Sequence, residues 1–538
     1  MRAVGMGILP VVKRNFKILL APVVFLLLGL SWTIASPPGS SADEQFHATS
    51  IWCAWGESET CEIAPDQASV NVPGAISKSF CYVSWPAILG AGCLSEFIEN
   101  SPYNDTLTTA TYFSLDSYYS PAYFKVARTF VGLDVEDSVL SIRLFNVVLA
   151  SLFFLWALAV STPPIKRALA LSWGLAIIPV GIFFIASINP SSWMILSVGT
   201  YWAFLATALS PRISSKRRSA AWIGALATSL VALGSRTDAV LYLSIATAAI
   251  LVLQWRAIAQ HLNRAAIFIL VALSTLIGLL GVRIFTNRFS TLNLGWGSDI
   301  AADGLPVPLK TISEMPVFFF GLFGGQGFFS DIRTARENFP DIRISGFLYG
   351  LGWMEFDLPA FVGLFGATSA LVVIFLMLRN LSVSKALAVF LLIFSSASVI
   401  LVLRATVDFR NSSQVQPRYF FPLLIAGLGI VLVARIKKKP LLSNAQGWFL
   451  VIVLTVSGSV AWLATATRYA VGPYATLTDF GQPYEWWWHI GPGRLGWFIF
   501  TIAVTGLWLF ATVFLWGRVS RRALESPAKT PIGAQLDD

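Results

Sequence analysis

Charged residues are scarce in this 538-residue chain: Asp, Glu, Lys and Arg make up 12% of it, and it contains only three histidines and four cysteines. Soluble domains carry about 25% charged residues, so the composition excludes an ordinary soluble protein. No basic stretch is interleaved with aromatic residues, and nothing indicates nucleic-acid binding. The cysteines do not form CxxC pairs, which argues against a structural zinc site. The chain is instead 56% hydrophobic, with a mean hydropathy of +0.69.

Apolar runs recur along the whole chain and predict an all-α, polytopic membrane protein. Runs of about 20 residues can cross the hydrocarbon layer as helices, and the alternating pattern of a membrane β-barrel is missing. Basic clusters such as VVKRNFK, PRISSKRR and RIKKK favour the cytoplasmic side and place both termini inside. We predict about twelve spans, over residues 17–35, 139–160, 168–187, 192–209, 219–234, 238–255, 265–285, 358–378, 386–403, 417–434, 447–467 and 494–516.

Two long segments are predicted to lie outside, within a single transmembrane domain formed by residues 1–516. Residues 36–138 include PAYFKVARTFVGL, whose apolar positions share one helical face and predict an interfacial helix. Residues 286–357 contain MPVFFFGLFGGQGFF, which is too short and too rich in glycine for a span and favours a re-entrant or interfacial helix. Residues 517–538 are a predicted cytoplasmic tail.

All four cysteines lie in the first outside segment, where an oxidising compartment permits disulfides. Four cysteines allow three pairings, and Cys53–Cys61 with Cys81–Cys93 is the most local of them. Basic residues precede the first apolar run, as they do in signal peptides and in membrane anchors. The length of the run favours an uncleaved anchor.

Three titratable side chains follow this first run closely, in the stretch SPPGSSADEQFHATS. Asp43 and Glu44 are adjacent, and His47 shares a face with Glu44 if the stretch is helical. A partly desolvated carboxylate at a membrane edge can act as a general base, or it can help to hold Mg²⁺ or Mn²⁺. The alternative is a solvated acidic loop without a chemical role. The residues alone leave both interpretations open and do not decide whether a metal is used.

Several short motifs occur in a characteristic order along the chain. The anchor and its PP…DE..H stretch are followed by SIRLFNVVLAS, ASINPSSW, GLGWMEFDLP and QPRYFFPLL. Together they resemble the bacterial membrane family of domain of unknown function 2142, which is related to the C-type (GT-C) glycosyltransferases. The four-cysteine insert and the GSSA before the acidic pair depart from the family pattern. The resemblance implies a GT-C-like arrangement of helices and the transfer of a sugar from a polyprenyl-phosphate donor to a cell-envelope glycan.

The resemblance also implies roles for individual residues. It places an acidic residue of the first outside segment at the reaction centre, here Asp43 as general base, with Glu44 orienting the acceptor or binding a cation. Arginine suits the donor phosphate because its fork matches two oxygens at once. The candidates are Arg418, Arg404, Arg410 and Arg236 for the phosphate, and His47, Tyr419, Trp487 and His489 for other substrate contacts.

Most of these candidates also have an ordinary structural explanation. Arg418 would extend to the membrane interface, and Arg236 would pair with Asp238 two residues later. Trp487, in EWWWH, would belong to an interfacial aromatic belt. Asn189, just before Pro190, would cap the following helix.

Two other functions compete with sugar transfer. A flippase for lipid-linked oligosaccharides would carry ionisable residues near the centres of its spans, and these spans are nearly free of charge. An O-antigen-type glycan ligase or polymerase would work outside without a catalytic carboxylate. For all three we expect a bacterial cytoplasmic membrane protein whose site faces outside and whose partners are membrane lipid, a lipid-linked sugar and an envelope glycan.

Overall fold

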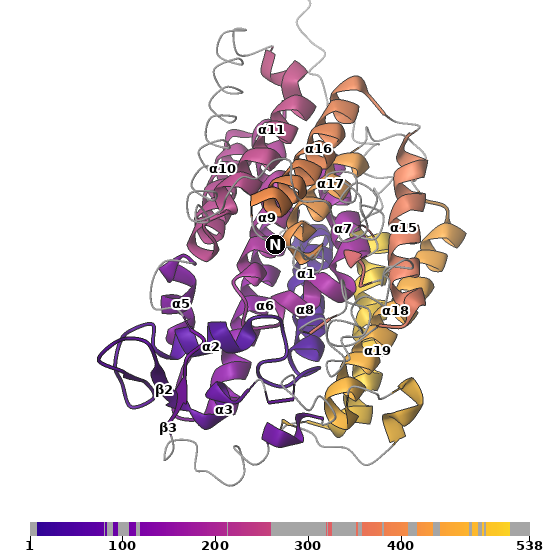
Figure 1. Ribbon diagram of the computed structural model, residues 1–538. Coiled ribbons are helices and arrows are strands. Elements are labelled where there is room, and N and C mark those ends of the chain that lie inside the picture. Colours follow the sequence, from indigo (N-terminus) through magenta and orange to yellow (C-terminus); the bar gives the residue numbers. More distant parts are fainter. Residues whose placement is uncertain are drawn as a thin grey trace, which may run out of the picture.

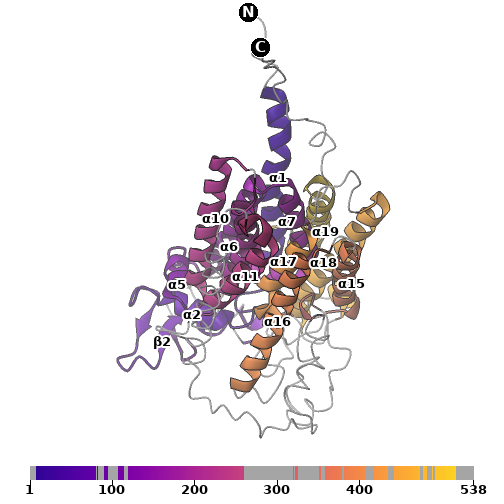
Figure 2. The ribbon, with the colours of Figure 1, turned by 90° about the horizontal axis from the view of Figure 1, so that it is seen from above.

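The computed structural model of the chain is mostly helical, and its long helices lie side by side in a bundle (Figure 1). Viewed from above, α1 extends beyond the other helices at its N-terminal end (Figure 2). The structure describes residues 8–79, 81–82, 90–94, 107–113, 119–211, 213–259, 319, 321–324, 351–352, 358–378, 381–406, 417–433, 442–472, 476–481, 487–488 and 491–516.

The long helices follow the predicted apolar runs. Two central ones are deeply buried: α9 along its whole length, and α7 with its continuation α8 from Arg167 onward. The helices of the bundle are α1 (Ile8–Thr33), α6 (Val135–Val160), α7 (Pro163–Ala176), α8 (Ile182–Ile185), α9 (Ser191–Ala208), α10 (Ser215–Ser235), α11 (Ala239–Ala259), α15 (Ala360–Leu378), α16 (Val383–Thr406), α17 (Phe421–Leu432), α18 (Asn444–Val471) and α19 (Gly493–Phe510).

The predicted number of about twelve spans is not confirmed. Among the described residues, six helices are long and apolar enough to cross a membrane, and three shorter apolar helices accompany them. α9 and α10 occupy two of the predicted spans, but the many Ser and Thr residues of α9 and the SKRR start of α10 reduce their hydropathy. The predicted span 265–285 lies outside the described residues. The six helices are Val135–Val160, Pro163–Ile185, Ala239–Arg256, Ala360–Leu378, Asn444–Val471 and Gly493–Trp516.

Packing in the bundle brings α1 against α6 and α19, and α9 against α6, α10, α11 and α17. α1 and α6 approach so closely that a Cβ atom on Gly29 would overlap the Val147 side chain. The outer faces of α10, α16 and α18 expose large apolar side chains such as Leu226, Phe390 and Phe449. Such faces are expected of helices that meet lipid.

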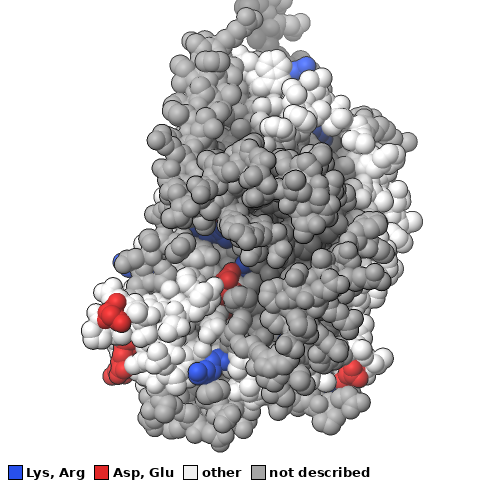
Figure 3. All heavy atoms as spheres, in the orientation of Figure 1, with Lys and Arg blue, Asp and Glu red and all other residues white. Residues whose placement is uncertain are grey.

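Residues 36–138 contain the only strands found in the described part of the chain, so the expected all-α class is corrected to mostly helical. Strands β1 (Glu62–Ile63), β2 (Val70–Pro73) and β3 (Leu107–Ala110) form an antiparallel sheet in that order. Val70 and Val72 are buried while Asn71 between them is not, the alternation expected of a half-buried strand. In Figure 3, acidic side chains gather at the edge of the molecule where Figure 1 shows these strands.

The predicted disulfides are confirmed. Cys53 pairs with Cys61 and Cys81 pairs with Cys93, with Cα atoms 5.4 and 6.2 Å apart. The predicted helix exists as α5 (Pro121–Arg128), which buries Tyr123, Phe124 and Ala127, and its place at the membrane interface stays a prediction. Most of the predicted re-entrant stretch and the whole tail lie outside the described residues.

Candidate functional site around Asp43 and Glu44

The segment that joins α1 to α2 (Glu44–Trp52) is held in place by side chains from distant parts of the chain. Gly39 turns the backbone with a φ of 79° and lies against the Ser79 carbonyl, where a Cβ atom would not fit. Backbone carbonyls in a loop need donors, and here buried side chains supply them. The donors are Trp488 to Ile34, Arg143 to Ser36 and Pro37, Tyr82 to Pro38, Tyr469 to Ser40, and Asn189 and Arg418 to Ala42.

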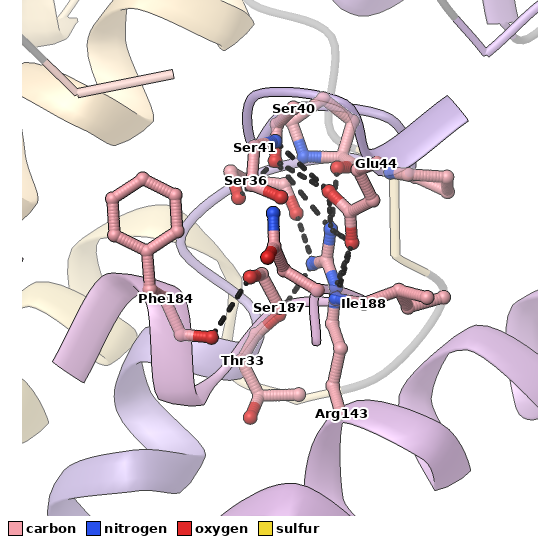
Figure 4. Close-up of polar contacts among 12 residues, drawn as sticks. Thr33, Ser36, Ser40, Ser41, Glu44, Arg143, Phe184, Ser187 and Ile188 are labelled. Atoms are coloured by element: carbon pink, nitrogen blue, oxygen red, sulfur yellow. Dashed lines mark hydrogen bonds and ion pairs between the residues drawn. The ribbon is translucent and has the colours of Figure 1, made fainter. Parts of the chain in front are cut away.

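Glu44, the first residue of α2, forms a fully buried ion pair with Arg143 of α6 (Figure 4). The Arg143 Nη2 atom lies 2.9 Å from Oε1 and 3.0 Å from Oε2, and Nε lies 3.1 Å from Oε1. The backbone N–H groups of Ser41 and Ile188 each donate to the carboxylate at 2.9 Å. Both charged side chains have an exposed fraction of 0%. We call Glu44, Arg143, Ser41 and Ile188 the Glu44 network.

Arg143 also joins this pair to the backbone. Its Nη1 atom donates to the carbonyls of Thr33 at 2.9 Å and Ser36 at 2.8 Å, and Nη2 donates to Pro37 at 2.8 Å. The guanidinium carbon lies 5.6 Å from the centroid of the Trp488 ring. Arg143 therefore fixes the end of α1, the loop and the start of α2 to α6. Glu44 was predicted to orient the acceptor or bind a cation, but its carboxylate is enclosed and already satisfied.

Asp43 lies one residue earlier but in a different environment. Its φ of 64° and ψ of 10° fall in the left-handed region, which is uncommon for residues other than glycine and is often found at functional sites. Its side chain is 26% exposed, and Oδ2 lies 2.7 Å from Nη2 of Arg418, which is itself 4% exposed. Arg418 also donates from Nη1 to the Ala42 carbonyl at 3.1 Å. The Asp43 carboxylate is thus fixed by a buried cation and still accessible.

The charges around Asp43 determine its protonation. Burial is the largest single influence and raises the pKa of Asp43, but the surrounding basic groups, led by the charge and hydrogen bond of Arg418, together lower it more, so the pKa lies below its ordinary value. The carboxylate is therefore ionised at neutral pH. His47, one turn later on α2, is fully enclosed, and burial lowers its pKa to about 3. His47 is therefore neutral, and its Nδ1 atom has no hydrogen-bond partner among the described residues.

Arg236, which follows α10, reaches the same place from another side. Its Nε atom lies 2.9 Å from Oδ1 of Asp238 and its Nη2 atom 2.7 Å from Oδ2, which confirms the predicted pair. The Tyr419 ring contacts both arginines, with its centroid 5.2 Å from the Arg236 guanidinium and 5.3 Å from that of Arg418. These cation–π contacts bring the arginines of two distant segments together.

Two tyrosines of residues 36–138 complete this group. Burial, followed by the charge of the nearby Asp43 carboxylate, raises the pKa of Tyr112. The Tyr119 ring lies 4.8 Å from the His47 ring, and its backbone forms a β-bridge with Arg236. The resulting group, which we call the Asp43 cluster, consists of Asp43, His47, Tyr112, Tyr119, Arg236, Arg418 and Tyr419.

The sequence-based candidates therefore separate into three sets. Asp43, His47, Arg236, Arg418 and Tyr419 come together. Glu44 belongs to the network behind them. Trp487 is buried and packs against Tyr469 at 6.2 Å, in the interior of the protein. Arg410, His489 and the side chain of Arg404 lie outside the described residues.

Sequence reasoning missed Arg143, Tyr112 and Tyr119. For Arg143 a signal was present, because a charged residue inside an apolar run, as in SIRLFNVV, is expected to have a partner within the protein. The predicted cap at Asn189 is found: its Oδ1 atom accepts from the Ser191 N–H at 2.9 Å. Its Nδ2 atom has a second role, donating to the Ala42 carbonyl next to Asp43 at 2.8 Å.

A metal site does not form from the acidic pair and His47. In the part of the chain that the structure describes, no three His, Cys, Asp or Glu side chains group closely enough to hold an ion. The Glu44 carboxylate is already paired with Arg143, and the Asp43 carboxylate with Arg418. The charges that face the accessible carboxylate are guanidinium groups, which suit an anionic ligand.

Residues 26–426 match the family described as predicted membrane protein (DUF2142), and the chain belongs to that family. The match extends from α1 to α17 and so includes both the Glu44 network and the Asp43 cluster. No curated protein and no solved structure matches the chain. The resemblance to the family is thereby confirmed, and its relation to GT-C enzymes stays a prediction.

Proposed function

We propose that this protein is a membrane glycosyltransferase that moves a sugar from a polyprenyl-phosphate donor to a hydroxyl of a cell-envelope acceptor. One observation carries the proposal: an accessible carboxylate, Asp43, is fixed in a left-handed backbone conformation beside the buried guanidinium of Arg418. A base and an anion-binding cation at one place are the two groups that this reaction requires.

The roles follow from the chemistry of the transfer. A lipid phosphate leaves as a stable anion, so the site needs no acid to protonate it. Asp43 would take the proton of the acceptor hydroxyl while that oxygen forms its bond to the sugar C1 atom. The bond between C1 and the phosphate oxygen breaks at the same time, and its electron pair stays on the phosphate. Arg418 would stabilise that added charge.

The arrangement changes the role that we give to Glu44. A catalytic group has to reach the reacting atoms, and Glu44 has no exposed surface. Through Arg143 it instead fixes the loop that carries Asp43. We therefore treat Glu44 and Arg143 as positioning residues and keep Asp43 as the general base.

The test is sugar transfer by purified protein in lipid nanodiscs, offered a panel of polyprenyl-phosphate sugars and envelope-glycan acceptors. Asp43→Asn should reduce turnover by about 10²–10⁴-fold, the usual contribution of a general base. Asp66→Asn is the matched control, because Asp66 is an exposed acid of the same outside segment. It should retain full turnover.

The other outcomes separate the competing functions. Full turnover in Asp43→Asn would eliminate the proposed base. Transfer of a preassembled glycan that survives Asp43→Asn would favour a ligase or polymerase. If the protein moves a lipid-linked oligosaccharide across a bilayer without transferring sugar, it is a flippase and the proposal fails.

A further inference from the structure

The two arginines of the Asp43 cluster differ in how their forks are filled. Nε and Nη2 form the edge of a guanidinium that grips two oxygens side by side. In Arg236 both atoms of this edge are bound to the carboxylate of Asp238, at 2.9 and 2.7 Å. In Arg418 only Nη2 is bound, to one oxygen of Asp43, and Nε has no hydrogen-bond partner among the described residues. Arg418 thus has a half-filled fork.

We propose that the donor phosphate and Asp43 compete for the fork of Arg418, so that binding of the phosphate releases the carboxylate to act as the base. This inference rests on the proposed function and adds a coupling between donor binding and the general base. It applies to a phosphate carried by a prenyl chain, because the reacting donor is lipid-linked.

The contacts of the Arg418 guanidinium explain why a bound phosphate would displace the Asp43 carboxylate. Its guanidinium lies over the Phe184 ring at 5.1 Å and the Tyr419 ring at 5.3 Å, and Nη1 is bound to the Ala42 carbonyl. A phosphate that grips Nε and Nη2 together therefore needs the Nη2 atom that Asp43 occupies. Arg236 cannot bind the phosphate in this two-point way, because its Nε and Nη2 atoms are already bound to Asp238.

The released carboxylate would become a stronger base. The groups that face Asp43 are Arg418 before α17, Arg236 after α10, His47 on α2, and Tyr112 after β3. Arg418 is the largest of the influences that lower the pKa of Asp43, so the pKa rises when Arg418 turns to the phosphate. The acceptor proton then goes to Asp43. When the lipid phosphate leaves, Arg418 pairs with Asp43 again and the proton passes to water.

The experiment measures binding of farnesyl phosphate to the full-length protein in nanodiscs by isothermal titration calorimetry. Asp43→Asn removes the competing charge, so it should bind farnesyl phosphate about tenfold more tightly than the wild type. Arg418→Gln should bind it at least tenfold more weakly. Asp66→Asn is the charge-matched control: it also removes one carboxylate, at an exposed position, but leaves both the Arg418–Asp43 pair and the Arg236–Asp238 pair, and it should change affinity less than threefold.

These variants separate the inference from the proposed function. Binding that does not depend on Arg418 would overturn both the donor site and the exchange. Binding that depends on Arg418 but is no tighter in Asp43→Asn, or is equally tighter in Asp66→Asn, would overturn the exchange alone. Asparagine tolerates the left-handed conformation of residue 43, so Asp43→Asn should fold, and an unchanged unfolding temperature verifies this.

Competition experiments identify the source of the phosphate. Dioleoyl phosphatidic acid and inorganic phosphate are added at the concentration of farnesyl phosphate. Failure of both to displace it supports a prenyl-phosphate site. Displacement by phosphatidic acid would overturn that assignment in favour of a general phospholipid phosphate, and equal binding of inorganic phosphate would remove the role of the prenyl chain.

Discussion

Glu44 and Asp43 are neighbours in the sequence, and the structure places them in opposite situations. The Glu44 carboxylate is completely buried and bound by Arg143 and two backbone N–H groups. The Asp43 carboxylate is partly exposed and bound by an arginine whose fork is half filled. The comparison shows that adjacent carboxylates can differ in their surroundings: the Glu44 network is closed and holds the loop, whereas the Asp43 carboxylate stays partly exposed, as our proposed function requires.

The largest expected effect on stability concerns the Glu44 network, which we infer holds the loop in place. Glu44→Gln leaves the buried Arg143 charge without its counterion, which should lower the free energy of unfolding by about 3–5 kcal/mol. Thermal unfolding in detergent measures the change. The control is Glu59→Gln, which changes an exposed acid elsewhere in residues 36–138. It should change the free energy of unfolding by less than about 0.5 kcal/mol. An unfolding temperature of Glu44→Gln equal to that of the control would remove the supporting role of the network.

A second, intermediate effect concerns His47, the buried neutral group of the Asp43 cluster. Its folded-state pKa of about 3 lies below the ordinary value of 6.5, so the unfolded chain binds a proton that the folded protein excludes. The stability that neutral His47 contributes is complete above pH 6.5. It is lost as the pH falls from 6.5 towards 3, by about 1.4 kcal/mol for each pH unit.

The measurement compares thermal unfolding of the wild type and His47→Gln between pH 7.5 and 4.5. The wild type should lose stability more steeply than the variant below pH 6.5, and their slopes should be alike above it. If stability falls equally steeply with pH in both proteins below pH 6.5, His47 binds a proton as easily in the folded protein as in the unfolded chain. The enclosed position of the histidine beside Arg418 and Arg236 would then need another explanation.

How far the sequence predicted this site depends on the range of each interaction. Local pairs were predicted correctly: the two disulfides join cysteines 8 and 12 residues apart, and Arg236 binds Asp238 two residues away. The pairing of Asp43 with Arg418 was not predicted; the two residues were only proposed for the same site, as general base and as phosphate-binding arginine. The partner of Glu44 lies 99 residues away. The position of Arg143 inside an apolar run indicates a partner within the protein, but no local pattern identifies Glu44 as that partner, and so both carboxylates were assigned to the reaction centre.

The smallest expected effect tests the backbone of Asp43. A side chain in the left-handed region costs roughly 1 kcal/mol because Cβ crowds the carbonyl, and glycine is free of this cost. Asp43→Gly and Asp43→Ala both delete the contact with Arg418, so their difference isolates the backbone term. Asp43→Gly should be the more stable of the two by about 1 kcal/mol in thermal unfolding, and both should lack turnover.

If Asp43→Ala is equally stable, the conformation at residue 43 carries no strain, and the loop holds Asp43 in a position that any residue could adopt. If the difference is found, the chain keeps an aspartate where glycine would be easier to fold, as expected for a carboxylate retained for its chemistry.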